Sequence, residues 1–218
     1  MSSVETFRQN FYNNGSIPPI TLEQVDLLSL TAKSVDDLVA TLSGTRLGVA
    51  ASYGEKCVLV ALAFSSESRI LLITMNGTSG SGSAKRQKNI LRDGLLCNIS
   101  LEKHGYFMER LAAALYLDLG LYIRHAFDLT SDGDRRGSMA AYKGVLARAR
   151  TQDSLDESVV EYIFAEQAFI LSRKKEFALR AWASYVGVEG IPEKLEVIDT
   201  FSKSPQARFS HKPCLVYL

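Results

Sequence analysis

The sequence has few cysteines, and those it has stand far apart. Cys57, Cys97 and Cys214 are an odd number without close spacing. This argues against a disulfide framework and against a zinc site built on paired cysteines. A chain without disulfides suits a reducing compartment, so we expect a cytoplasmic or nuclear protein.

The chain also lacks an excess of charge of one sign. It has 25 Lys and Arg against 24 Asp and Glu, which gives a formal net charge of +1. No overall field therefore draws it to nucleic acid or to an anionic membrane, and any such contact has to come from a local patch. No apolar run approaches the about 18 residues of a membrane-spanning helix, and residues 1–10 lack the apolar centre of a signal peptide. We expect no membrane partner.

What is present fits one globular domain with tails. Hydrophobic residues make up 46% and charged residues 22% of the 218 positions, as is typical of globular domains. The polar start, with its Asn-Gly and Pro-Pro pairs, predicts a flexible N-terminal arm over residues 1–25. The main domain is expected over 26–190. Gly187, Gly190 and Pro192 end the regular pattern, so residues 191–218 are expected to form a C-terminal extension or tail.

Three short apolar runs follow one another at 46–51, 57–64 and 69–75. Short turns at 53–56 and 65–68 separate them, so the runs predict an antiparallel meander of three strands. The middle run is apolar on both faces, which indicates that helices cover both sides of the sheet. A helix is expected before the meander, since Ser34 and Asp37 form a capping-box pattern and helical spacing follows.

The rest of the chain alternates between helical and strand patterns. We expect a helix over 85–92, a short strand over 97–100, a helix from Phe107 to Gly120 and a strand over 122–127. Helical composition returns at 138–150, and a second capping box at Ser154–Glu157 opens a long helical region that reaches Tyr185. This order predicts an α/β fold, with a mixed sheet flanked by helices.

The same order, from about Thr31 to Tyr185, resembles the RNase D-like DEDD 3′–5′ exonucleases. The resemblance is carried by four segments: the lead-in helix at 31–38, the meander, Lys-His-Gly-Tyr-Phe-Met-Glu at 103–109, and Asp-Leu-Gly-Leu-Tyr-Ile with Ala-Phe-Asp-Leu at 118–129. It implies an RNase H-like sheet in which parallel strands follow the antiparallel meander.

The residues that this chemistry needs are largely missing. The family holds two divalent ions with four carboxylates, and the ions activate water and stabilise the leaving oxygen. Where the first strand would carry Asp-x-Glu, this chain has Ala50 and Ser52. Glu109, or Leu111 if the register shifts, stands near the Asp of the second motif. The final motif, a Tyr and an Asp one helical turn apart, is matched best by Tyr162 or Ile163 with Gln167. The resemblance therefore implies a degenerate pseudo-exonuclease that binds no catalytic metal or other cofactor.

Such a domain is expected to act as an RNA-binding or protein-scaffolding subunit in RNA processing or RNA silencing. The resemblance implies RNA or another single-stranded nucleic acid, a protein partner or a second copy of the chain as partners. One alternative is an active nuclease that uses Glu109, Asp128, Asp132 and Glu166 with Mg²⁺ or Mn²⁺. Another alternative is an oligomerisation module that binds no nucleic acid.

Basic side chains supply the candidate nucleic-acid contacts, through phosphate binding along a groove. Basic residues cluster in three places: Lys85, Arg86, Lys88 and Arg92; Arg135, Arg136 and Lys143; and Arg173, Lys174 and Lys175. The candidate contacts are the first cluster together with Arg135 and Arg136. The first cluster follows the meander closely and is expected to border the former active-site cleft. Simple surface solvation is favoured for such basic clusters, and phosphate contact is the functional alternative. His104 and His125 are candidate acid–base groups, although a structural role is favoured for each.

Overall fold

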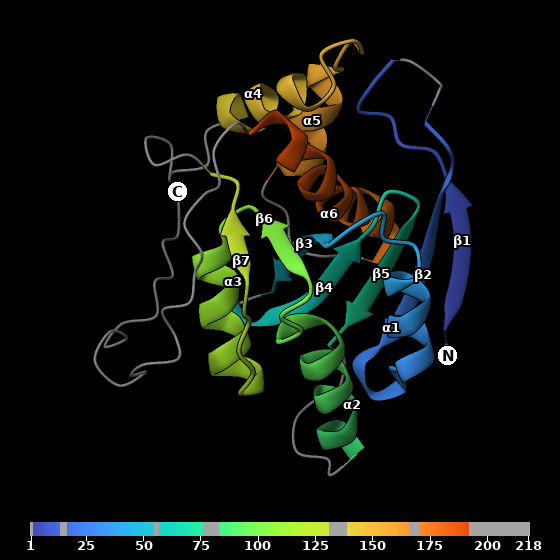
Figure 1. Ribbon diagram of the computed structural model, residues 1–218, viewed down its shortest axis with the longest axis vertical. Coiled ribbons are helices and arrows are strands. Elements are labelled where there is room, and N and C mark those ends of the chain that lie inside the picture. Colours follow the sequence, from blue (N-terminus) through green and yellow to red (C-terminus); the bar gives the residue numbers. More distant parts are fainter. Residues whose placement is uncertain are drawn as a thin grey trace.

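The computed structural model describes residues 2–13, 17–54, 57–75, 83–130, 139–165 and 171–191. A seven-stranded sheet is flanked by helices on both sides (Figure 1). The strands are β1 (Ser3–Phe7), β2 (Ile20–Asp26), β3 (Arg46–Tyr53), β4 (Leu59–Ser65), β5 (Arg69–Thr74), β6 (Glu102–Gly105) and β7 (Ala126–Asp128). The α-helices are α1 (Ala32–Val39), α2 (Ser83–Leu91), α3 (Met108–Ala114), α4 (Met139–Ala149), α5 (Glu157–Phe164) and α6 (Lys174–Gly187).

Short helical turns extend or join these elements. Two are π-helical, η3 (Arg92–Leu96) after α2 and η4 (Leu115–Leu119) after α3. The others are 3-10 turns, η1 (Leu27–Ser29), η5 (Leu171–Arg173) and η6 (Val188–Gly190). None of the helices in the described ranges has the length and apolar character to cross a membrane.

The strand order is β1-β2-β5-β4-β3-β6-β7. Strands β3, β4 and β5 form the predicted antiparallel meander. Strand β6 then pairs with β3 in parallel, and β7 pairs with β6 in parallel. The predicted fold class, an antiparallel meander continued by parallel strands and flanked by helices, is confirmed.

Two hydrophobic clusters lie on opposite faces of the sheet. On one face, side chains of α1, α2 and α3 pack on the odd residues of β3, from Leu47 to Tyr53; we call this the α1–α3 face. On the other, side chains of α4, α5 and α6 pack on Ala50, Ala61 and Ala63; we call this the α6 face. In Figure 1, α4–α6 lie together at the top and α1–α3 lie below. The apolar middle strand is thus covered on both sides, as predicted.

The structure differs from the predicted flexible arm over residues 1–25. Strand β2 pairs with β5 in parallel, and β1 pairs with β2 at the edge of the sheet. Ile20 and Leu22 alternate into the core, and Phe11 is fully buried with its ring 6.0 Å from that of Trp182. The neighbouring proline and asparagine-glycine pairs hide this short alternation in the sequence. Of the predicted extension over 191–218, only Ile191 lies within the described residues.

Several helix and strand limits also differ from the prediction. Helix α1 is capped by Thr31 rather than Ser34, since the Thr31 hydroxyl accepts a hydrogen bond from the Ser34 N–H at 3.2 Å. No strand forms at 97–100; the strand that pairs with β3 begins at Glu102. The helical region opened by the second capping box is two helices, α5 and α6. The α5 N-cap is Asp156, whose carboxylate accepts from two backbone N–H groups.

Candidate functional site

The face of β3 that the exonuclease resemblance singles out is lined by small residues. Gly48, Ala50 and Ser52 alternate with the odd residues of β3 and so point toward the α6 face. Their partners on β4 are small as well, because Ala50 pairs with Ala63 and Ser52 pairs with Ala61. Ser52 is only 4% exposed. These side chains together form a smooth and mostly apolar floor.

Helix α6 lies directly on this floor. A Cβ atom added to Gly48 would stand 2.1 Å from the Ala181 carbonyl oxygen and 2.6 Å from the Tyr185 backbone nitrogen. Strand and helix backbones therefore approach as closely as a glycine allows. Ala178 and Ala181 of α6 are fully buried in the same cluster. At Gly48 there is no space between strand and helix for a carboxylate or an ion.

Aromatic rings fill the adjoining region where the β6–α3 connection meets α4 and α5. The Tyr106 ring lies 4.8 Å from Tyr142 and 5.4 Å from Phe164, and the last two rings stack at 4.2 Å. Phe107 adds a further ring, 6.3 Å from Tyr142. Burial raises the pKa of the Tyr106 phenol far above its ordinary value, so this hydroxyl stays neutral. Tyr142 belongs to the hydrophobic cluster of the α6 face, and the half-buried Tyr106, Phe107 and Phe164 pack against that cluster.

The two acidic candidates near α3 have different surroundings. Glu109 is exposed in the first turn of α3, where a carboxylate is favoured by the helix dipole. Asp128 is held by local hydrogen bonds. One of its carboxylate oxygens accepts the Met108 N–H at 2.8 Å, and the other accepts the Thr130 N–H at 2.8 Å and the Thr130 hydroxyl. Asp128 therefore ties the end of β7 to the start of α3.

The two described residues of the predicted final motif, Tyr162 and Ile163, differ in their burial. Tyr162 is 52% exposed, and the Arg173 guanidinium lies 4.2 Å from the centre of its ring. Ile163 is buried in the core, and Gln167 lies outside the described residues. The helix that packs most extensively on β3 is α6.

Sequence reasoning missed α6 as the helix on this face. At the spacing of one helical turn, α6 carries Phe177 and Ala181, which have no side-chain oxygen. The sequence pattern that could have identified α6 was Phe177 followed by alanines four and six positions later, Ala181 and Ala183. Helical periodicity alone does not tell which of two apolar helices packs on which strand.

Within the ranges that the structure describes, no three His, Cys, Asp or Glu side chains gather closely enough to hold a metal ion. Asp132 and Glu166, which the nuclease alternative requires, lie outside those ranges.

The Lys-His-Gly segment of β6 is buried. Lys103 is 0% exposed, and its ammonium donates to the carbonyls of Asn98 at 2.6 Å and Leu101 at 2.9 Å. Burial lowers the pKa of Lys103 to about 8. His104 is 5% exposed and stacks on Phe127 with ring centres 4.9 Å apart. These contacts indicate a structural role for Lys103 and His104. His125, by contrast, is exposed.

The four basic residues of the first cluster divide into two pairs. Lys85 and Arg86 are exposed at the start of α2. Lys88 donates to the Leu119 carbonyl at 3.1 Å. Arg92 donates to both carboxylate oxygens of Asp93, at 2.7 and 3.0 Å. Arg135 and Arg136 lie outside the described residues.

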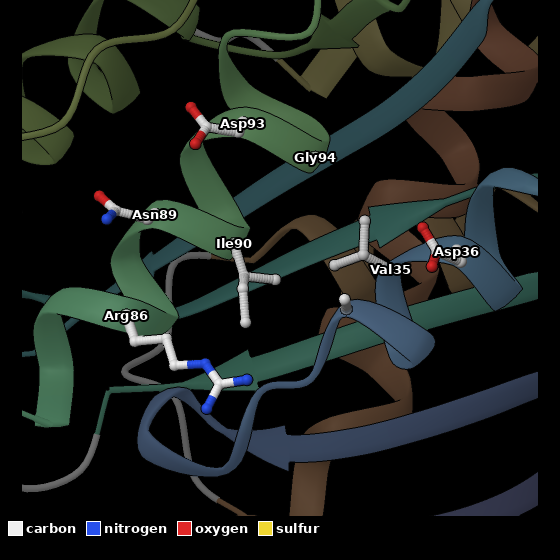
Figure 2. Close-up of a pocket in the computed structure, with 8 residues that line it drawn as sticks. Val35, Asp36, Arg86, Asn89, Ile90, Asp93 and Gly94 are labelled. Carbon is white, nitrogen blue, oxygen red and sulfur yellow. The ribbon is translucent and has the colours of Figure 1, made fainter.

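Helix α2 does not border the face lined by Ala50, contrary to expectation. Its buried Leu91 belongs to the cluster of the α1–α3 face, on the opposite side of the sheet. A groove of about 440 Å³ runs between α1 and α2. Figure 2 shows Val35 and Ile90 pointing toward one another across it, while Asn89 and Asp93 point outward from α2. Asp36 of α1 and Arg86 of α2 also line the groove.

No protein-family model matches this sequence. No curated protein matches it either. Solved structures do resemble it. The catalytic core of RRP6 from Trypanosoma brucei is 16% identical with a TM-score of 0.47, and the match covers 82% of this chain and 48% of that one. NrnC from Brucella melitensis is 11% identical with a TM-score of 0.42, and the match covers 76% of each chain.

The EXD2 exonuclease domain is 17% identical with a TM-score of 0.39, and the match covers 78% of this chain and 88% of that one. The chain is thus similar in structure to 3′–5′ exonuclease domains, and it spans about half the length of the RRP6 core. Identities this low do not carry a neighbour's chemistry over to this chain.

Proposed function

We propose that this chain is a non-catalytic exonuclease-like domain that binds single-stranded RNA and serves as a scaffolding subunit in RNA processing or RNA silencing. The observation that carries the proposal is the contact between β3 and α6. Glycine, alanine and serine line the strand where the exonuclease resemblance requires carboxylates, and the helix backbone lies directly on Gly48.

Two-metal hydrolysis needs hard oxygen ligands in close array. The Ala50 methyl group cannot ligate an ion, and the Ser52 hydroxyl is neutral and buried. We place the degenerate final motif on α6, at Phe177 and Ala181, because α6 is the helix that packs on β3. Glu109 then remains as a single carboxylate, which is too few for a two-metal site.

The nuclease alternative is weakened by what its other residues do. Asp128 accepts the Met108 N–H at the start of α3 and the Thr130 N–H just after β7, so recruiting it to a metal would remove the bond that supports the start of α3. RNA binding, by contrast, requires only exposed cations and rings, and Lys85 and Arg86 supply exposed cations. These observations favour binding over cleavage.

The test is a titration of the purified chain with 5′-labelled single-stranded RNA, with Mg²⁺, with Mn²⁺ and with EDTA. We expect intact RNA that the protein retains, with a log K that falls as log salt rises, in all three conditions. Shortening from the 3′ end that EDTA and Glu109→Ala both abolish would contradict the proposal. No retention at low salt, with a defined oligomer by light scattering, would instead support a protein-only module.

A further inference from the structure

Strand β1 forms an edge of the sheet, and among the described residues no strand pairs with its outer side. It stands at the end of the strand order, pairs only with β2, and lies at the right margin of the molecule in Figure 1. A strand in this position presents a row of unpaired N–H and C=O groups along its free side. These groups can bind a further strand that is added to the sheet.

This edge lacks the features that usually protect such strands from pairing, which are lysine or proline, a bulge, or very short length. β1 has five residues, Ser-Val-Glu-Thr-Phe, without lysine or proline, and its pairing with β2 runs without a shift in register. At the opposite end of the sheet, β7 is only three residues long. In the described part of the chain, β1 is therefore the edge that is open to pairing.

The single charge on β1 is neutralised by α6. The carboxylate oxygens of Glu5 lie 2.7 Å from the Lys174 ammonium and 3.1 Å from the Lys175 ammonium. The Lys175 ammonium also lies 5.8 Å from the centre of the Phe7 ring, which packs on the cluster of the α6 face. These contacts hold β1 against the start of α6, so the strand presents its free edge in a fixed position.

The other side of β1 carries two exposed β-branched residues. Glu5 and Phe7 point toward the α6 face, so Val4 and Thr6 point the opposite way. Val4 is 63% exposed, and Thr6 is exposed as well. Side chains of this kind stabilise a sheet by packing beside a cross-strand neighbour. In the described structure Val4 has such a neighbour on one side only, Glu23 of β2.

We propose that β1 pairs in antiparallel orientation with β1 of a second copy of this chain, so that the two sheets continue as one across a two-fold axis. Opposite residues in such a pair point to the same face, so the axis has to pass through a residue. An axis through Glu5 pairs all five residues of the strand, whereas an axis through Val4 or Thr6 pairs only three. Val4 then packs beside Thr6 of the second copy, and the reverse pair forms by symmetry.

Charge complementarity favours a second copy as the occupant of this edge. Opposite Cβ atoms in an antiparallel pair are about 4.5–5.5 Å apart, so the axis brings the two Glu5 carboxylates close together on the α6 face. Each carboxylate carries Lys174 and Lys175 with it, and the Lys175 side chain is 48% exposed and can reach the carboxylate of the second copy. A second copy thus supplies both the carboxylate and its counter-ions at this position, which an unrelated strand would have to match.

The inference goes beyond the proposed function, because it concerns how two copies associate and does not depend on RNA binding. A five-residue edge is small beside a standard interface of about 1,600 Å². We therefore expect a reversible dimer whose fraction falls on dilution.

The experiment is sedimentation equilibrium of the full chain at several concentrations, after thermal unfolding has shown that each variant folds. Val4→Lys places a cation on the edge, as many natural edge strands do, and it acts twice across the axis. We expect it to raise the dimer Kd at least about tenfold. Ile99→Lys is the matched control, because Ile99 is also β-branched and is 64% exposed, but it lies outside the strands. It should leave the dimer Kd unchanged.

Cysteine cross-linking tests the register. Glu5→Cys places two thiols opposite each other at the axis, where Cα atoms about 4.5–5.5 Å apart permit a disulfide. Ser3→Cys places its two thiols about 13 Å apart along the ladder and should not cross-link. The wild type, oxidised in the same way, controls for the native cysteines.

The outcomes separate this inference from the proposed function. A wild type that stays monomeric at every concentration overturns the second copy as the occupant, whether or not the chain retains RNA. A dimer that Val4→Lys leaves unchanged, or that Ile99→Lys weakens equally, overturns the assignment to β1. A dimer that Val4→Lys dissociates and Glu5→Cys cross-links supports the inference, and RNA retention by the same samples then tests the proposed function by itself.

Discussion

Gly48 shows how a single missing side chain sets the geometry of the molecule. The backbone of α6 lies where a β-carbon on β3 would be. This contact could not be predicted from the sequence, because a glycine in a strand pattern is equally compatible with a bulge, a bend or a close approach. The absence of the side chain becomes informative only when the opposing helix is known.

Gly48→Ala is therefore expected to destabilise the protein by at least about 3 kcal/mol, since backbone atoms rather than flexible side chains oppose the new methyl group. The measurement is urea unfolding followed by circular dichroism. Gly144→Ala in α4 is the control, because an added Cβ there meets nothing within 4 Å. It should stabilise the helix by about 0.5–1 kcal/mol. Equal effects at the two sites would contradict the close approach.

Lys103 predicts a specific pH dependence. Burial lowers the pKa of Lys103 to about 8 from its ordinary value of 10.5. Between these values the unfolded chain binds more protons than the native one, so the free energy of unfolding rises with pH. With allowance for solvent screening, we expect this residue to add about 1–2 kcal/mol between pH 7.5 and 9.5.

The measurement for Lys103 is urea unfolding of the wild type and of Lys103→Met at both pH values. The difference between the two proteins isolates this residue, since other groups titrate alike in each. The free energy of unfolding of the wild type should increase relative to that of Lys103→Met as pH rises. A difference that stays constant would show that Lys103 keeps its ordinary pKa.

At the scale of secondary structure, the predictable parts were those with a local cause. The meander followed from three apolar runs and two tight turns, and all three strands form close to the expected limits. The choice of α6 over α5 as the helix on β3 has no local cause, because both have buried apolar residues. The sequence pattern around Tyr162 matched the final exonuclease motif, but the Tyr162 ring is exposed. The spacing of apolar residues identifies the buried face of a helix, but it does not identify the strand on which that face packs.

Asp128 supports the start of α3, so Asp128→Ala is expected to cost about 1–2 kcal/mol, as the loss of other helix caps does. Amide hydrogen exchange at Met108 should accelerate, because its N–H loses its acceptor. Asp128→Asn keeps an oxygen acceptor and should cost less. RNA retention should be unchanged in both variants if the proposed function is right. Loss of a metal-dependent activity on Asp128→Ala would favour the nuclease instead.

Phe11 belongs to the core although the sequence suggested an arm. Its ring is fully buried beside Trp182, so Phe11→Ala is expected to destabilise the protein by about 3–5 kcal/mol. Val4 of β1 is 63% exposed, and Val4→Ala should change stability by less than about 0.5 kcal/mol. Thermal and urea unfolding of the two variants provide the comparison. Unchanged stability on Phe11→Ala would support the predicted flexible arm instead.

At the scale of the whole molecule, metal ions should not act as ligands of the native state. A ligand that binds only the folded chain stabilises it, by about 2.7 kcal/mol at a hundred times its Kd. In the described part of the chain no acidic cluster forms, so we expect millimolar Mg²⁺ or Mn²⁺ to leave Tm unchanged. Differential scanning calorimetry with and without EDTA checks this. A rise in Tm that Glu109→Ala removes would reveal a metal site.

The N-terminal strands also determine when the chain can complete its fold. The Tyr12 hydroxyl donates to the Leu146 carbonyl, 134 residues further along, and β2 can pair only with β1 until β5 exists. Segments that leave the ribosome early must therefore wait for those made much later. Contacts of such long sequence separation slow folding. During synthesis β1 and β2 can pair with each other but stay separate from the meander until β5 has been made, and one face of the sheet stays uncovered until α6 has been made.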